Sequence, residues 1–201
     1  MAAWNLFLAI FSFIGMTRVV PHLLYSIYRN GYYHTICGET LPHYGHGAVS
    51  FWCTLFVLSK IPELLDTLFI VLRKKPLMFL HWYHHITVML YSWHGIGNLS
   101  PGGIYFIGMN YTVHAIMYFY YFLTACGIRP KWAKCVTIIQ LSQMVVGVMV
   151  CASSIYYRYY AVPCATTDEA LRWGIVMYSS YFALFLKFFL DRFLFKKSKK
   201  E

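Results

Sequence analysis

The chain has 201 residues, of which 59% are hydrophobic, 20% aromatic and only 12% charged. A water-soluble domain carries about a quarter charged residues, so this composition excludes an ordinary soluble globular protein. The formal net charge is +10 at pH 7, but the basic residues are grouped between long apolar runs, as in polytopic membrane proteins. No nucleic-acid partner is needed to explain this charge, and the lipid bilayer is the expected surrounding.

Six apolar stretches are long enough to cross the hydrocarbon layer as helices, which takes about 20 residues each. They are too long for the strands of a membrane β-barrel, which alternate over about ten residues. The predicted fold is therefore all-α, a single membrane-embedded domain over residues 1–201 with six transmembrane helices. The expected spans are residues 4–27, 47–72, 78–97, 102–124, 132–156 and 170–194.

The distribution of Lys and Arg predicts the orientation of these spans. Most basic residues lie in the connectors after the second and fourth spans and in the C-terminal tail, and such segments stay cytosolic. Both chain ends are then expected in the cytosol. The tail Lys197-Ser198-Lys199-Lys200-Glu201 resembles a dilysine retrieval signal, which favours the endoplasmic reticulum membrane, although a plain stop-transfer cluster would look the same.

Cysteine positions agree with this orientation. Cys37 and Cys164 fall in connectors that the charge pattern places in the lumen, which is an oxidising compartment. We expect a disulfide between them, the alternative being two free thiols. The other cysteines fall inside predicted helices: Cys53, Cys126, Cys135 and Cys151.

The second span contains three ionisable residues, Lys60, Glu63 and Asp66. Ionisable groups are costly in hydrocarbon and usually mark function. Lys60, Glu63 and Thr67 share one helix face, and Pro62 removes a backbone donor and predicts a kink. The alternative is that Lys60 and Glu63 only neutralise each other as a buried pair. Three charges and a kink in one span favour a site.

The third span opens with His81, His84 and His85, whose spacing places three imidazoles on one helix face. The fourth span carries Asn110 and His114 one turn apart. Further polar residues follow along the fourth and fifth spans: Tyr118, Tyr121, Thr137, Gln140 and Gln143.

Depth brings these residues together, because alternate spans run in opposite directions. At 1.5 Å per residue they lie roughly 5–18 Å inside the cytosolic boundary. Below this layer the spans are almost purely apolar. The sequence predicts a site that opens to the cytosol and suits a substrate with a charged head and an apolar tail. The basic residues at its mouth either hold phosphate groups or reflect topology alone; they are Arg73, Lys74, Lys75, Lys131 and Lys134.

Four blocks resemble a known family. KIPELLDT, HWYHH, MNYTVHAIMYFYY and TIIQLSQ, in this order within residues 60–143, resemble the signatures of the very-long-chain fatty acid elongases, the 3-oxoacyl-CoA synthases. The Trp-Tyr inside the histidine box and the following ITVMLYSWH are most similar to the subfamily that elongates saturated and monounsaturated chains, the palmitate elongases.

The resemblance implies a reaction and a site. Long-chain acyl-CoA and malonyl-CoA condense to 3-oxoacyl-CoA, CO2 and CoA, in a helix barrel around a tunnel closed at the luminal end. It implies that His84 carries the acyl group as an acyl-imidazole, with His114 as its partner; His81 and His85 are expected to assist. No cofactor or metal is expected. The expected substrate-binding residues are Lys60, Glu63, Asp66, Arg73, Asn110, Tyr118, Tyr121, Gln140 and Gln143.

Family members usually have seven membrane helices, so the chain is expected to lack the first of them. The other enzymes of the elongation cycle are expected partners, and homo-oligomerisation is left open. Two other classes compete with the elongase interpretation. A membrane di-iron desaturase also uses HxxHH but needs about eight histidine ligands, as a catalytic metal site built from several boxes, and there is no second box here. A transporter would need polar residues that continue to the lumen and inverted repeats.

Overall fold

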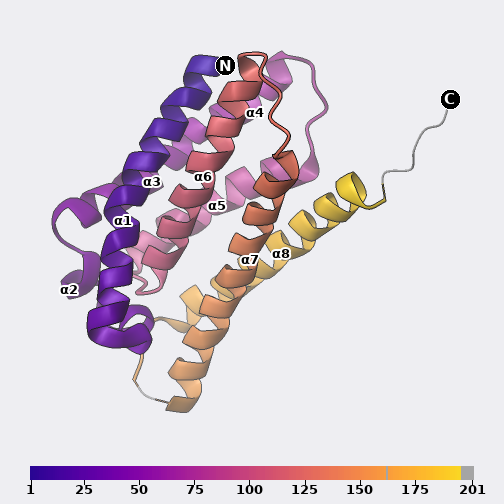
Figure 1. Cartoon of the computed structure of the whole chain (residues 1–201). Helices are drawn as coiled ribbons and strands as arrows, with labels where there is room; N and C mark the ends of the chain where they lie inside the picture. The colour runs from indigo at the N-terminus through magenta and orange to yellow at the C-terminus, as the bar shows by residue number, and fades with distance from the viewer. Residues whose placement is uncertain (162, 196–201) are drawn as a thin grey trace.

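The computed structural model describes residues 1–161 and 163–195. Every regular element in this part is helical (Figure 1), as the long apolar segments predict. The dilysine sequence in the tail lies outside these residues. The helices are α1 (Ala2–Cys37), α2 (Thr40–Tyr44), α3 (Gly47–Glu63), α4 (Leu65–Leu72), α5 (Phe79–Gly97), α6 (Gly103–Ala125), α7 (Ala133–Tyr156), the π-helical turn η1 (Tyr157–Ala161) and α8 (Asp168–Phe193).

The expected spans match these helices with three differences. The second span is divided into α3 and α4 at Leu64, two residues after Pro62, because proline cannot supply the backbone donor that a continuous helix needs. The first span extends to Cys37 across a kink at Gly31, whose φ of 81° lies in the left-handed region that favours glycine. The short helix α2 is an addition that periodicity does not predict.

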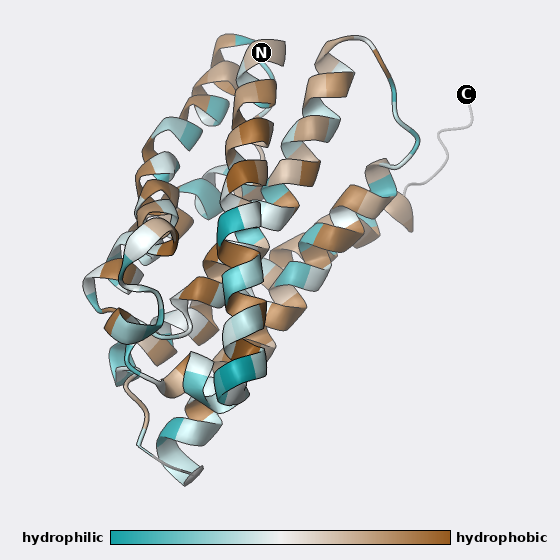
Figure 2. Ribbon diagram, turned by 60° about the vertical axis from the view of Figure 1, so that its left-hand side comes forward, coloured by the Kyte–Doolittle hydropathy of each residue, from teal (hydrophilic) through white to brown (hydrophobic). Residues whose placement is uncertain are grey.

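Six long elements form a closed ring. Helix α1 packs against α3 and α6, α6 against α7, α7 against α8, α8 against α5, and α5 against α3. The helices are apolar over most of their length (Figure 2), so each can bury two faces against neighbours and present a third to lipid. This arrangement is the barrel that the resemblance implies. Although α5 and α6 follow each other in the chain, they stand on opposite sides of the ring.

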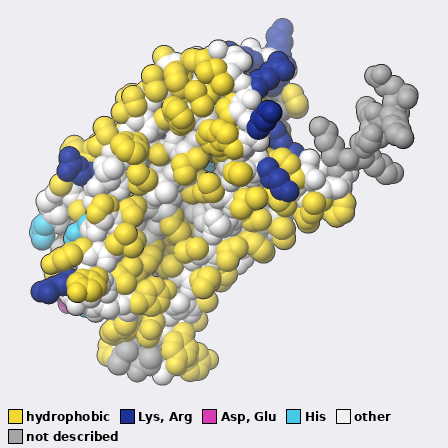
Figure 3. Space-filling view, viewed as in Figure 1, with side chains coloured by type: hydrophobic (Ala, Val, Ile, Leu, Met, Phe, Trp, Pro, Cys, Tyr) yellow, Lys and Arg dark blue, Asp and Glu magenta, His cyan; other side chains and the backbone are white. Residues whose placement is uncertain are grey.

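Hydrophobic side chains cover much of the face seen in Figure 3, and basic side chains lie near its edges. Large apolar side chains are exposed along several helices, including Phe7 at 57%, Leu90 at 60% and Met149 at 60%, a pattern that a soluble monomer does not tolerate. Three helical segments, Ala2–Cys37, Ala133–Tyr160 and Asp168–Phe193, are long and apolar enough to cross a membrane by length and composition. The protein is therefore a membrane protein with several apolar helices.

Two glycines allow neighbouring elements to approach closely. A Cβ atom on Gly15 of α1 would lie 2.4 Å from the ring of Tyr111 on α6, and the Tyr111 hydroxyl donates to the carbonyl of Trp52 on α3 (2.8 Å). A Cβ atom on Gly147 of α7 would lie 2.1 Å from Tyr178 on α8. Small residues take this role in membrane helices because packing, rather than water exclusion, drives their association.

A disulfide between Cys37 and Cys164 joins the C-terminal end of α1 to the segment before α8. Beside it, the backbone N–H of Ala165 donates to the carbonyl of Cys37 (2.9 Å), and the Tyr33 hydroxyl donates to the carbonyl of Pro163 (2.6 Å). We call this end of the ring the disulfide end, and the opposite end, where Met1 lies, the mouth.

Replacing Cys37 with Ser should destabilise the protein by about 2–4 kcal/mol, because the disulfide closes a long loop in the unfolded chain. Thermal unfolding in detergent, with and without reductant, measures this. The wild type should lose stability in reductant and Cys37→Ser should not respond to it. Cys126→Ser, which removes an exposed free thiol, is the matched control, and an equal loss in both variants would contradict the prediction.

His43 of α2 is buried at the disulfide end, 8% exposed. Its ring lies 5.7 Å from that of His22 and 6.2 Å from that of His34. Burial, followed by repulsion from these two imidazoles, lowers the pKa of His43 to about 4. Nε2 of His43 is buried without a hydrogen-bond partner among the described residues. Protonation of Nε2 would therefore give the buried imidazole a positive charge that no neighbouring group compensates.

The lowered pKa of His43 predicts a loss of stability in acid. Its folded-state pKa lies below the unfolded value near 6.5, so the stabilisation is complete above pH 6.5 and is lost as the pH falls through about 4. Unfolding midpoints from pH 7.5 to 4 should fall less steeply for His43→Leu than for the wild type. His46→Leu, at an exposed position, should keep the wild-type slope, and parallel curves for all three proteins would refute the assignment.

Candidate active site

A cavity of about 530 Å³ lies inside the ring, towards the mouth. Five of the six ring helices, α1, α5, α6, α7 and α8, contribute to its lining together with the short helix α4, and polar side chains alternate with apolar ones around it. The polar or ionisable residues that line it are Asn5, Asp66, Arg73, His81, His84, His85, Asn110, His114, Tyr118, Tyr121, Thr124, Gln140 and Gln143.

The cavity therefore brings together nearly all of the residues that the sequence singles out. The three box histidines come from α5, whereas His114 and Asn110 come from α6 on the opposite side of the ring. Lys60 and Glu63 do not line the cavity. They lie behind its wall, where the Lys60 ammonium donates to Oδ1 of Asn110 (3.1 Å), and their expected contact with substrate stays a prediction.

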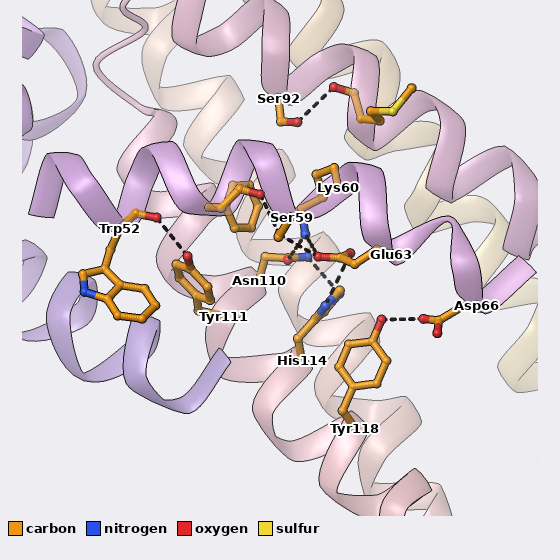
Figure 4. A network of polar contacts seen from close by, with 12 residues as sticks. Trp52, Ser59, Lys60, Glu63, Asp66, Ser92, Asn110, Tyr111, His114 and Tyr118 are labelled. Atoms are coloured by element: carbon orange, nitrogen blue, oxygen red, sulfur yellow. Dashed lines mark hydrogen bonds and ion pairs between the residues drawn. The ribbon is translucent and has the colours of Figure 1, made fainter. Parts of the chain in front are cut away.

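Lys60 and Glu63 form an ion pair inside the ring, 2% and 4% exposed (Figure 4). The Lys60 ammonium donates to Oε1 of Glu63 (2.7 Å) and to Oδ1 of Asn110 (3.1 Å). The Ser59 hydroxyl also lies within hydrogen-bond distance of Oε1 of Glu63, at 2.9 Å, and the ring of Phe56 lies 4.1 Å from the ammonium. The pair is thus satisfied on several sides, as buried charges must be, and it connects α3 to α6.

This pair determines the state of His114. Because the Asn110 carbonyl accepts from Lys60, the Asn110 amide nitrogen is the group that faces Nε2 of His114, at 3.2 Å. An amide can only donate there, so Nε2 carries the lone pair and Nδ1 carries the proton. Nδ1 faces Oε2 of Glu63 at 3.9 Å. His114 is thereby held as one neutral tautomer with a fixed ring orientation.

Asp66 connects the short helix α4 to two others. One of its carboxylate oxygens accepts from the Trp4 indole on α1 (2.8 Å), and the other accepts from the Tyr118 hydroxyl on α6 (2.7 Å). Thr67 lies 3.1 Å from Nε2 of His81. Since α4 has no fully buried residue, these side-chain hydrogen bonds fix its position at the mouth.

The box histidines have different surroundings. His81 and His85 pack ring against ring (4.5 Å). The imidazole of His84 lies against α8, 5.0 Å from the ring of Tyr181 and 6.1 Å from that of Phe185. Within residues 1–161 and 163–195, no cluster of three or more His, Cys, Asp or Glu side chains is arranged to hold a metal ion.

A second, narrower cavity of about 70 Å³ continues towards the disulfide end. Asn110 lines both cavities, so the two lie on either side of this residue of the Lys60 network. The lining of the second cavity is mostly hydrophobic and includes Phe56, Val57, Val88, Phe106, Ile107 and Tyr178. It offers an apolar extension to whatever the larger cavity holds.

Sequence reasoning missed several contributors. Trp4 and Asn5 belong to a span with no local polar pattern, and Tyr181 and Phe185 belong to the last span. A signal for the latter pair exists in the i, i+4 spacing of two aromatic residues, next to Ser179 and Ser180 in the central part of the helix. Nothing in that spacing says which helix they face.

Comparison with known proteins decides the family. The GNS1/SUR4 family, ELO, matches the chain over residues 1–201. The chain belongs to the ELO family. It is 42% identical over 200 residues to very long chain fatty acid elongase 4 of Trypanosoma cruzi (strain CL Brener), covering 98% of this chain and 70% of that protein. It is 43% identical over 199 residues to very long chain fatty acid elongase 6 of Gallus gallus, covering 98% and 74%.

A similar ELO protein is very long chain fatty acid elongase 6 of Mus musculus, 42% identical over 200 residues, with 98% of this chain and 74% of that protein covered. Membership of the ELO family sets aside the desaturase and the transporter as classes for this chain. It also agrees with the four sequence blocks, all of which contribute residues to the cavity or to the ion pair behind it.

Removing the charge of Lys60 alone should cost about 3–5 kcal/mol of stability, because it leaves the Glu63 carboxylate buried and uncompensated. Lys60→Met should therefore unfold at a clearly lower temperature than Lys60→Met/Glu63→Gln, in which the charge that remains is also removed. Thermal unfolding of the single and double variants measures this difference. If the double variant is the less stable one, the ion pair does not have the role described.

Proposed function

We propose that this ELO protein catalyses the condensing step of fatty acid elongation, in which a long-chain acyl-CoA and malonyl-CoA give 3-oxoacyl-CoA, CO2 and CoA. The observation that carries the proposal is that His84 and His114 line one cavity from opposite walls, with a second, mostly apolar cavity on the other side of Asn110. Family membership and the names of the relatives support the same reaction class. In enzyme terms the protein is a very-long-chain 3-oxoacyl-CoA synthase.

The first half-reaction transfers the acyl group to the protein. A nitrogen of the His84 imidazole attacks the thioester carbon, the C–S bond breaks, and CoA leaves as the thiol with the proton that the imidazole loses. The product is a neutral acyl-imidazole. Histidine suits this step because an acyl-imidazole is reactive enough to be attacked by a carbon nucleophile in turn.

The second half-reaction consumes malonyl-CoA. Loss of CO2 leaves an enolate, whose carbon attacks the acyl carbon; the C–N bond to His84 breaks and the imidazole regains a proton. The developing oxyanion needs nearby hydrogen-bond donors. Gln143, 6% exposed and lining the cavity, is placed to donate from its amide. His114, fixed in one tautomer by Asn110, faces the same space.

The cavity also protects the intermediate. Acyl-imidazoles hydrolyse readily in water, so an apolar lining that excludes bulk solvent extends their lifetime. The acyl tail would lie mainly in the larger cavity, with room in the second cavity for its end only, whereas the CoA portion would remain at the mouth. Arg73, exposed at the end of α4 and lining the larger cavity, is a partner for a phosphate group.

The expected cellular setting follows from the two ends of the ring. The disulfide requires an oxidising compartment, which supports a luminal disulfide end and a cytosolic mouth in the endoplasmic reticulum membrane. The C-terminus is then cytosolic. Acyl-CoA and malonyl-CoA are cytosolic metabolites, and they reach the mouth from that side. The enzymes that reduce and dehydrate the 3-oxo product are the expected functional partners.

The condensation is tested with detergent-purified protein, palmitoyl-CoA and labelled malonyl-CoA. The wild type should form labelled 3-oxoacyl-CoA, and His84→Ala should lose activity by roughly a thousandfold or more, since the covalent route lacks its nucleophile. His94→Ala, on the same helix near the disulfide end, is the matched control and should retain activity.

A second measurement separates the reaction from the residue assignment. Without malonyl-CoA, the wild type should release one equivalent of CoA per protein as the acyl group is transferred, and His84→Ala should release none. If His84→Ala still releases one equivalent, another group carries the acyl chain. If the wild type forms no condensation product at any chain length, the proposed reaction is wrong.

A further inference from the structure

Within the described part of the chain, side-chain hydrogen bonds hold some of the histidines of the cavity and leave others without one, among them His84, the residue assigned the acyl group. His81 lies within hydrogen-bond distance of Thr67, and His114 accepts from Asn110. The His84 imidazole, by contrast, has no hydrogen-bond partner among the residues that the structure describes. What it has is a wall of aromatic rings on α8, made by Tyr181 and Phe185.

Tyr181 is itself fixed from its far end. Its hydroxyl lies 2.7 Å from Oγ1 of Thr87, which is one turn from His84 on α5. The Thr87 hydroxyl also lies 2.5 Å from the backbone carbonyl of Tyr83. Since Thr87 has one hydrogen and the carbonyl can only accept, Thr87 donates to Tyr83 and Tyr181 donates to Thr87.

This arrangement has two consequences for Tyr181. Its hydroxyl proton is committed to Thr87, so the residue does not act on substrate as an acid. Its ring is held at both ends, by the α8 backbone and by Thr87, and it is 3% exposed. A buried aromatic ring anchored in this way is a rigid surface against which a neighbouring ring can rest.

We propose that Tyr181 is a positioning residue for His84: its anchored ring restricts rotation of the imidazole and holds the attacking nitrogen towards the cavity. This inference rests on the proposed function, in which His84 accepts the acyl group. An imidazole without hydrogen bonds would otherwise sample several orientations, and only those aimed at the thioester carbon react. The effect concerns the orientation of the nucleophile, so it should change the rate of acyl transfer rather than the binding of acyl-CoA.

Four substitutions dissect the contact. Tyr181→Phe keeps the ring and removes its anchor, Thr87→Val removes the same anchor from the other side, and Tyr181→Leu removes the ring. Thr87→Ser keeps the hydroxyl and should retain most of the acyl-transfer activity. The matched control is Ser180→Ala. It removes the contact between the Ser180 and Tyr83 hydroxyls (3.1 Å), which joins the same two helices but does not fix a ring against His84.

The readouts are the rate of CoA release in the absence of malonyl-CoA, kcat and KM for palmitoyl-CoA, and the thermal unfolding midpoint. Tyr181→Phe and Thr87→Val should each slow acyl transfer about tenfold with little change in KM, and Tyr181→Leu should slow it further. Thr87→Ser and Ser180→Ala should stay within about twofold of the wild type.

The outcomes separate this proposal from the reaction itself. Equal losses in Tyr181→Phe and Ser180→Ala, tracking their unfolding midpoints, would reduce Tyr181 to a structural residue and overturn the proposal. So would a rise in KM with unchanged kcat, which would make it a binding residue. A wild type without condensation activity would instead refute the proposed function, and this is known before any variant is compared.

Discussion

The ion pair between Lys60 and Glu63 is the interaction on which the site depends. A lone charge inside a membrane protein is too costly to keep, so each residue requires the other, and Asn110 completes the coordination of the ammonium. Because the pair lies on α3 and Asn110 on α6, satisfying the charges fixes the distance and rotation between two helices. The tautomer of His114 then follows from the orientation of the Asn110 amide. The need to compensate two buried charges behind the wall thus determines which nitrogen of His114 carries the proton in the cavity.

The histidine side of the cavity is built by a different force. His81 and His85 pack on each other, and His84 rests on Tyr181 and Phe185. Dispersion and ring geometry govern these contacts rather than charge. One wall therefore presents an imidazole with a determined protonation state, and the other presents an imidazole free of hydrogen bonds. This asymmetry suits a reaction in which one histidine changes its covalent state and the other does not.

Much of this arrangement is predictable from sequence because it depends on local periodicity. The spans follow from apolar length, the shared face of His81, His84 and His85 from helical spacing, and the interruption near Pro62 from its missing donor. The position of Lys60 behind the wall is not predictable, since its i, i+3 spacing with Glu63 fits a cavity-lining pair equally well. The orientation of the Lys60 side chain depends on its hydrogen bond to Asn110, which lies fifty residues later in the chain.

The contacts of α8 show the same limit more clearly. Tyr181 meets Thr87 across 94 residues of sequence, and helix periodicity carries no information about which neighbour a buried face selects. That selection depends on the order of helices around the ring, which is not their order along the chain. The role of Trp4 cannot be predicted from sequence for the same reason, because it depends on one hydrogen bond to Asp66 on another helix.

The connection between α5 and α6 has a kinetic consequence. These helices stand on opposite sides of the ring, yet only residues 98–102 join them, so they must converge at the disulfide end, where Tyr91 and Phe106 are in contact (6.3 Å between ring centroids). Helix α2 fastens this short crossing through the Tyr44 hydroxyl, which donates to the carbonyl of Ser100 (2.5 Å). The crossing therefore narrows the space between the walls at the disulfide end and leaves the mouth as the wider approach. For the condensation proposed above, we expect both CoA esters to enter by the mouth, so that the first CoA departs before the second ester arrives, which is a ping-pong order that follows from the topology of the chain.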